Sequence, residues 1–284
     1  MQSFEVDETK RIDAVIATTK QLSRSFVNVL LDQGKVSVNG VAVYKPSFKV
    51  KAGDHIELDY AAEAEKEIPE IDLEILYEDD DCLVVIKPEG VLTHSKGAFN
   101  PEATVSTFIR PYTKGMEDNR GGIVHRLDRV TSGLLICAKH EKALQWLQKQ
   151  FADRNAHKVY VAVVKGTPAQ AEAVIDMPIE RNPKKPQTFR VGPNGKPSVT
   201  RYKVLANNET HSLVELHPKT GRTHQLRVHL HQIGHPILGD TLYEGEPADR
   251  VYLHAASLKL TLPNGKKQRF EAPIPSTFNQ KAAV

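Results

Sequence analysis

The sequence has little of what builds disulfide frameworks, metal clusters or membrane spans. Its 284 residues include 2 cysteines, and Cys82 and Cys137 each lie within an apolar stretch, which favours two buried thiols over a disulfide or a metal pair. No apolar run approaches the roughly 20 residues that a helix needs to cross a bilayer. The first residues, MQSFEVD, have neither a basic start nor an apolar core, so they do not predict a secretory signal. These absences favour a cytoplasmic location.

The chain also has little net charge, because its 38 Lys and Arg residues are nearly balanced by 35 Asp and Glu residues, which gives +3. The charge is unevenly spread along the chain. Residues 1–60 are neutral, residues 61–82 carry −9 and residues 83–284 carry +12. A large basic segment behind an acidic joint suits a polyanionic partner, although solvated surface charge explains the charge pattern equally well.

The first sixty residues predict two helices and a small curled sheet. Helical periodicity begins at Arg11, and a second helix is expected to start at residues 23–25 and to end at Gly34. Asn39-Gly40 between two apolar runs is typical of a tight hairpin, and residues 55–58 predict a further strand.

The rest of the chain predicts a linker and a second domain. Residues 61–71 are acidic, offer few groups for a core and include a proline, so they predict a linker. Residues 72–284 mix strands and helices without a regular βαβ order, which favours an α+β domain around a largely antiparallel sheet. The expected strands are residues 73–77, 83–87, 133–138, 159–164 and 213–216, and the clearest helix is 141–151.

One segment, residues 122–135, combines an apolar entry, the tetrad His-Arg-Leu-Asp, a Thr-Ser-Gly turn and an apolar run. This pattern would hold Asp128 on a loop anchored at both ends, which is what a catalytic carboxylate needs. Asp128 also lies between Arg126 and Arg129, so spacing alone explains it equally well as part of a surface ion pair.

A second segment, residues 219–240, is rich in Arg and His. If it is helical from Thr223 onward, Arg227 and His231 share one face. Clustered histidines can bind zinc, but this segment has no acidic partner of the HExxH type, so hydrogen-bonding and core roles are favoured. The histidines concerned are His224, His229, His231 and His235.

Part of the N-terminal unit resembles an S4 domain, an RNA-binding module. The resemblance rests on Leu22-Ser23-Arg24-Ser25 and on Gly34-Lys35-Val36-Ser37-Val38-Asn39-Gly40 behind it. In that family the second helix and the following loop face RNA phosphates, which implies this role for Arg24 and Lys35. Ordinary surface charge is the alternative for each residue taken alone.

Three ordered motifs resemble the RluA/RluD-type pseudouridine synthases over about residues 72–262. They are His125-Arg126-Leu127-Asp128 with Thr131-Ser132-Gly133-Leu134, then Lys158-Val159-Tyr160-Val161-Ala162, then residues 221–229 (GRTHQLRVH) continuing to 234–240 (GHPILGD). An S4 domain in front is typical of the RluC/RluD-like branch. Thr93-His94-Ser95 departs from relatives that often have a proline after the histidine, and we expect this to affect a loop and not the chemistry.

The resemblance implies an isomerase that breaks the N1–C1′ bond of a uridine in RNA, turns the uracil and rejoins it through C5. The reaction has no redox change and no external energy input, so no cofactor and no metal are expected. Asp128 matches the family's catalytic aspartate, acting while ionised either as a nucleophile or as a base at C2′. Arg227 matches the cation that keeps this carboxylate charged.

The same resemblance assigns three further residues. Tyr160 matches a tyrosine that lies against the uracil and helps to remove the C5 proton, although core packing would explain it without the motif. Arg126 is expected to fill the space that the uridine vacates when it leaves its stack. Arg222 is an expected RNA contact.

The expected partner is RNA, foremost large-subunit (23S-type) ribosomal RNA, with transfer RNA as the alternative and a monomer as the expected state. Two other classes stay open: a non-catalytic RNA-binding or ribosome-assembly factor, and a metal-dependent hydrolase built on the histidines.

Overall fold

The computed structural model describes residues 2–20, 22, 24–59, 69–94, 102–116 and 120–282. They form two compact units, one comprising the residues up to 70 together with 102–103, and the other comprising 71–94 and the residues from 104 onward. Ser23, Ser95 and residues 61–68, which make up most of the expected linker, lie outside the described residues.

The first unit contains the two helices and the small sheet that the sequence predicts. The sheet order is β1-β6-β3-β4. Asn39 and Gly40 connect β3 to β4 with positive φ angles of 51° and 81°, and Gly34 follows the second helix with φ 68°. The elements are β1 (Gln2–Glu5), β2 (Lys10–Arg11), α1 (Ile12–Thr19), α2 (Arg24–Asp32), β3 (Val36–Val38), β4 (Val41–Ala42), β5 (Lys49–Val50) and β6 (His55–Leu58).

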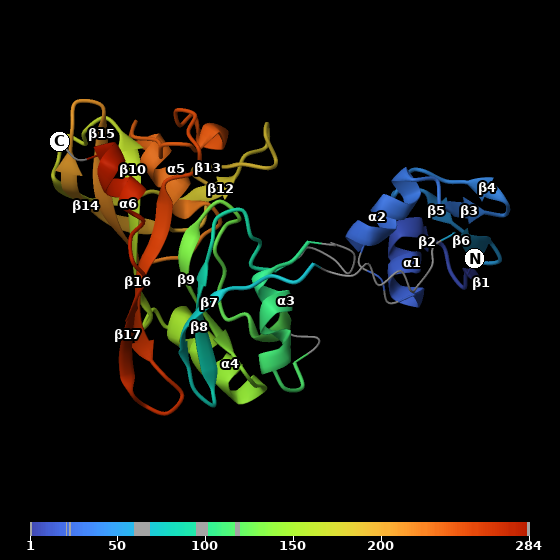
Figure 1. Cartoon of the computed structure of the whole chain (residues 1–284). Coiled ribbons are helices and arrows are strands. Elements are labelled where there is room, and N and C mark those ends of the chain that lie inside the picture. The colour runs from blue at the N-terminus through green and yellow to red at the C-terminus, as the bar shows by residue number, and fades with distance from the viewer. Residues whose placement is uncertain are drawn as a thin grey trace. The chain divides into compact units, whose positions relative to one another are not determined.

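The second unit is built on a nine-stranded mixed sheet with the order β11-β14-β15-β10-β16-β9-β8-β7, and β17 pairs with β16 (Figure 1). The β16–β9 pair is parallel, whereas the other strand pairs of this sheet are antiparallel. The predicted α+β domain with a largely antiparallel sheet is therefore confirmed. Its strands are β7 (Glu74–Glu78), β8 (Cys82–Lys87), β9 (Ser132–Ala138), β10 (His157–Lys165), β11 (Glu172–Asp176), β14 (Val199–Asn207), β15 (His211–Pro218), β16 (Leu253–Thr261) and β17 (Lys267–Glu271), beside the separate pair β12 (Ile179–Arg181) and β13 (Phe189–Val191).

The helices of this unit pack against the sheet or against the β12–β13 pair. The helices are α3 (Val105–Ile109), α4 (Glu141–Ala152), α5 (Gln225–Gln232) and α6 (Ser276–Ala282). The α4 helix is capped by His140, whose Nδ1 accepts the amide of Ala143, and it buries Leu144 and Leu147 against β9. The α6 helix contacts β10 and β15, and α5 contacts β13.

Two expectations about buried and membrane-spanning segments can be compared with the fold. Cys82 on β8 and Cys137 on β9 are both buried free thiols, as expected. None of the helices in the described part of the chain combines the length and apolar character of a membrane-crossing segment.

Candidate active site

A cavity of about 480 Å³ opens in the second unit, within the range typical of small-molecule sites. It is lined by the segment that leads into β9, the region from the end of α4 into β10, the connection from β15 to α5, and the start of β16. All five site residues expected in this unit line the same cavity: Arg126, Asp128, Tyr160, Arg222 and Arg227. Arg24 and Lys35 belong to the first unit.

The loop that carries Asp128 is fixed on both sides of the carboxylate. The backbone carbonyl of Asp128 accepts the amide of Thr131 at 3.0 Å, which closes a turn immediately before β9. On the other side, the buried hydroxyl of Thr93 donates to the carbonyl of Leu127 at 2.9 Å and accepts its amide at 3.1 Å. The sequence-based expectation of a loop anchored at both ends is thus what the structure shows.

Lys87 provides a third anchor, which sequence reasoning missed. It is fully buried at the end of β8, and its ammonium donates to the backbone carbonyls of Pro88, Val91 and Arg129. Burial lowers the pKa of Lys87 to about 7, against an opposing effect from the charge of Asp128. Lys87 therefore ties the loop after β8 to the loop of the carboxylate.

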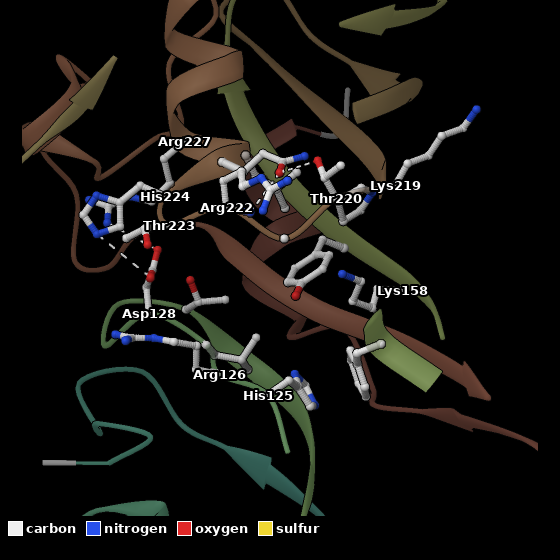
Figure 2. A pocket seen from close by; sticks show the side chains of 18 of the residues that line it. His125, Arg126, Asp128, Lys158, Lys219, Thr220, Arg222, Thr223, His224 and Arg227 are labelled. Atoms are coloured by element: carbon white, nitrogen blue, oxygen red, sulfur yellow. Dashed lines mark hydrogen bonds and ion pairs between the residues drawn. The ribbon is translucent and has the colours of Figure 1, made fainter. Parts of the chain in front are cut away.

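Asp128 faces an arginine that is itself held in place (Figure 2). Arg227 Nη1 lies 3.6 Å from Asp128 Oδ2. The Nε and Nη2 groups of Arg227 donate to the two carboxylate oxygens of Asp240, each at 2.7 Å. The side chains of Arg227 and Asp240 are 5% and 1% exposed, against 19% for Asp128. The carboxylate of Asp128 thus meets a preoriented cation from α5, which differs from the surface ion pair with its chain neighbours that spacing left open.

His224 completes the charged side of the cavity. Its Nε2 lies 3.9 Å from Asp128 Oδ1, and its Nδ1 lies 2.7 Å from the hydroxyl of Tyr243. Because that hydroxyl accepts the amide of Phe189, its own proton is available to His224 Nδ1, which leaves the ring proton on Nε2 towards Asp128. Burial lowers the pKa of His224, partly opposed by the charge of Asp128. His224 also has a positive φ of 57°, a backbone conformation uncommon for a side chain of this size.

Tyr160 lies on β10 and packs against the core while lining the cavity. The register between β10 and β16 shifts next to it, between Val159 and Tyr160, a feature common beside functional sites. Burial raises the pKa of Tyr160, and the charge of Asp128 raises it further. Its hydroxyl is therefore protonated at neutral pH.

The remaining cavity wall is basic. Among the described residues that line it, six are Lys or Arg and Asp128 is the one carboxylate. Arg126 is exposed. Arg222 donates from Nε to the carbonyl of Pro197 at 3.3 Å, and its backbone amide is held by Gln225. This balance of charge suits a polyanion such as RNA.

The other histidines of the α5 region have hydrogen-bonding and packing roles. His229 contacts Thr200 and the carbonyl of Met177, and His235 contacts the carbonyl of Lys165. The ring of His231 lies 6.2 Å from that of Tyr243. Within the described ranges, no three His, Cys, Asp or Glu side chains gather in a way that could hold a metal ion.

Sequence reasoning missed Asp240 and Tyr243 as parts of this site and gave His224 no role beside Asp128. Asp240 ends the GHPILGD stretch, so the motif contained a signal for it. Tyr243 follows in a short helical turn, Thr241–Tyr243, and no pattern in the sequence pointed to it.

Comparisons with known proteins agree with this geometry. Residues 81–232 match the family model described as RNA pseudouridylate synthase, and residues 10–56 match the S4 domain. Over 287 residues the chain is 38% identical to "Ribosomal large subunit pseudouridine synthase D" of Vibrio parahaemolyticus, covering 94% of this chain and 88% of the relative. Among solved structures, "Human RNA Pseudouridylate Synthase Domain Containing 1" matches with a TM-score of 0.61 at 30% identity, covering 72% of this chain and 84% of that chain. "Human RNA Pseudouridylate Synthase Domain Containing 4" matches with 0.58 at 26%, covering 72% and 89%.

Fold, cavity and matches together define an RNA-modifying isomerase that carries an S4 domain. The chain belongs to the RNA pseudouridylate synthase family and converts uridine in RNA to pseudouridine, as the motifs had predicted.

Proposed function

We propose that this chain modifies uridine in large-subunit ribosomal RNA, as a cytoplasmic monomer. Residues 1–60 would bind RNA, residues 61–71 would act as a linker, and residues 72–284 would carry out the reaction. The name of the Vibrio relative and its near full-length match support the substrate. The S4 match and the basic cavity support RNA as the partner.

The observation that carries the catalytic proposal is the arginine fixed between two carboxylates. Asp240 holds Arg227 so that its remaining nitrogen faces Asp128 in a cavity that can enclose a single nucleotide. Asp128 would act in its ionised form on the ribose of an extruded uridine. Attack as a nucleophile and removal of the C2′ proton are both compatible with this position.

Three cavity residues would handle the base and its flanking strand. The ring of Tyr160 offers stacking worth about 1–3 kcal/mol per base. Burial raises the pKa of the Tyr160 hydroxyl, which therefore stays protonated. Tyr160 would remove the C5 proton only by passing its own proton to a nearby acceptor, and Asp128 is available for this. Exposed Arg126 would fill the gap in the RNA stack, and Arg222 would contact the strand.

Replacing Asp128 tests the chemistry directly. With large-subunit ribosomal RNA carrying tritium at uridine C5, the wild-type protein should release the label, and Asp128→Asn should release none above background while binding RNA with unchanged affinity. Asp80→Asn, which changes an exposed carboxylate outside the cavity, is the matched control. Turnover by Asp128→Asn would contradict the mechanism, and release from transfer RNA alone would reassign the substrate.

A further inference from the structure

Lys158 is a cation of the cavity wall that has no role in the mechanism proposed so far. It lies two residues before Tyr160 on β10, and both side chains line the cavity. Alternation along a strand places them on one face, about 7 Å apart. Figure 2 shows Lys158 and Asp128 at separate parts of the cavity wall.

The surroundings of Lys158 are apolar or neutral. Its ammonium lies 5.9 Å from the centre of the Phe151 ring. Burial, helped by the charge of Lys158, lowers the pKa of His125 to about 3, so this neighbour is neutral at pH 7. The backbone of Gly221 lies close by, because a Cβ built there would be at an ordinary contact distance of 3.6 Å from the ammonium.

Within the described part of the chain, the Lys158 ammonium has no hydrogen-bond or ion-pair partner. Burial also lowers the pKa of Lys158, with no carboxylate opposing it. A cation withdrawn from water without a counterion is costly, and such groups are retained where a ligand supplies the missing partner.

The position of Lys158 relative to the other two groups indicates which part of the substrate it meets. Lys158 precedes Tyr160 by two residues on β10, and it lines a part of the cavity wall separate from that of Asp128 (Figure 2). With the ribose at Asp128 and the uracil against Tyr160, the next group along β10 meets the far edge of the base. A phosphodiester is bonded to the strand on both sides and stays near the rim, where Arg126 and Lys219 are exposed.

We propose that Lys158 donates a hydrogen bond to a carbonyl oxygen of the target uracil and stabilises the negative charge of the uracil while it is detached from the ribose. The inference rests on the proposed function of this cavity and adds a catalytic residue to it.

The charge arises from the bond that breaks. When N1 separates from C1′, the electron pair stays on N1 and is delocalised onto the carbonyl oxygens, where Lys158 would donate without giving up its proton. When C5 bonds to C1′, the ring supplies that electron pair. Loss of the C5 proton to an acceptor then restores the ring, so no oxidant or co-reactant is needed. A fixed donor placed where charge develops typically accelerates a reaction by about 100- to 1000-fold.

Single-turnover kinetics on C5-tritiated ribosomal RNA test this role. Lys158→Met should lower the rate at saturating protein by about 100- to 1000-fold and change the Kd for RNA by less than about threefold. Lys158→Arg should recover at least about tenfold of that loss, because it keeps a cation. Lys142→Met, on the exposed face of α4 and outside the cavity, is the control for loss of a lysine.

Two results would overturn the assignment. A raised Kd with a weaker salt dependence and an unchanged saturated rate would make Lys158 a phosphate contact. Equal losses in Lys158→Met and Lys158→Arg would exclude a role that depends on charge. Thermal unfolding checks the fold of each variant, and Lys158→Gln takes the place of Lys158→Met if that variant does not fold. If the wild-type protein releases no tritium, the substrate assignment fails and not this proposal.

Discussion

At the scale of single residues, the cavity aligns three charges: Asp240, Arg227 and Asp128. Breaking a buried ion pair such as the one between Arg227 and Asp240 costs about 3–5 kcal/mol, whereas an apolar replacement of a whole pair is often neutral. Stability alone therefore does not explain why a charged pair occupies this position. The orientation of the Arg227–Asp240 pair explains it, because this pair leaves one arginine nitrogen directed at Asp128.

Tyr243→Phe should slow the reaction about tenfold through loss of a single hydroxyl. That hydroxyl bonds His224 Nδ1 and accepts the amide of Phe189, so its loss lets the imidazole turn an unprotonated nitrogen towards Asp128. The free energy of unfolding should fall by about 1–3 kcal/mol, because the amide of Phe189 is left without its partner. Single-turnover rates and thermal unfolding measure the two effects.

Tyr252→Phe is the control for this change. Tyr252 is also buried, but its hydroxyl bonds Asp249 and it does not line the cavity. It should lose stability without losing rate. Equal rates for the Tyr243→Phe variant and the wild-type protein would show that the ring position of His224 does not matter for Asp128.

At the scale of secondary structure elements, the parallel pair of β9 and β16 joins two walls of the cavity. Gly133 on β9 opposes Ala255 on β16, with φ 111°. A Cβ at Gly133 would lie 2.3 Å from the backbone oxygen of Ala255, a distance that no side-chain movement can relieve. The glycine is therefore required by the close approach of the two strands.

Gly133→Ala should lower the free energy of unfolding by about 3 kcal/mol, the sum of backbone strain and overpacking. Gly265→Ala is a matched control, because Gly265 also has a positive φ of 81° but open space around its Cβ position. That change should cost about 1 kcal/mol. Urea unfolding compares the two, and equal losses would show that strand contact adds nothing to the strain.

The sequence predicted elements whose signal is local. The helix at residues 141–151 has apolar side chains at helical spacing, and Asn39-Gly40 matches a tight hairpin; both are confirmed. No prediction was made for β14 or β16. The position of β16 is set by its pairing with β9 and β10, which are distant in the chain, whereas β14 pairs with the adjacent β15 and was missed despite this local partner. The residues of the site likewise divide into those that a sequence motif predicts and those that have no local signal. Motif resemblance brought Asp128 and Arg227 together, but Tyr243 acts through a tertiary contact that leaves no pattern in the sequence.

At the scale of the whole molecule, charge is arranged by unit. The basic excess of residues 83–284 includes the six cations of the cavity wall. Residues 1–60 have no net charge, so their affinity for RNA must depend on where individual cations lie. Arg24 lies at the start of α2 and is exposed, with one nitrogen 3.3 Å from the buried carboxylate of Asp13, which Arg11 also binds. Lys35 is exposed directly after Gly34.

Arg24→Gln and Lys35→Gln should each weaken RNA binding about three- to tenfold at 0.1 M salt. Each lost phosphate contact should reduce the slope of log K against log salt by about 0.7–0.9. Asp13 keeps Arg11 in the Arg24→Gln variant, so the unit should stay folded. Lys51→Gln removes an exposed lysine of the same unit from the turn before β6 and should leave the slope unchanged. Fluorescence titration of large-subunit RNA across a salt series measures all three. If the slope of every variant equals that of the wild type, the first unit does not bind phosphates through these residues, and the cavity wall supplies the electrostatic affinity alone.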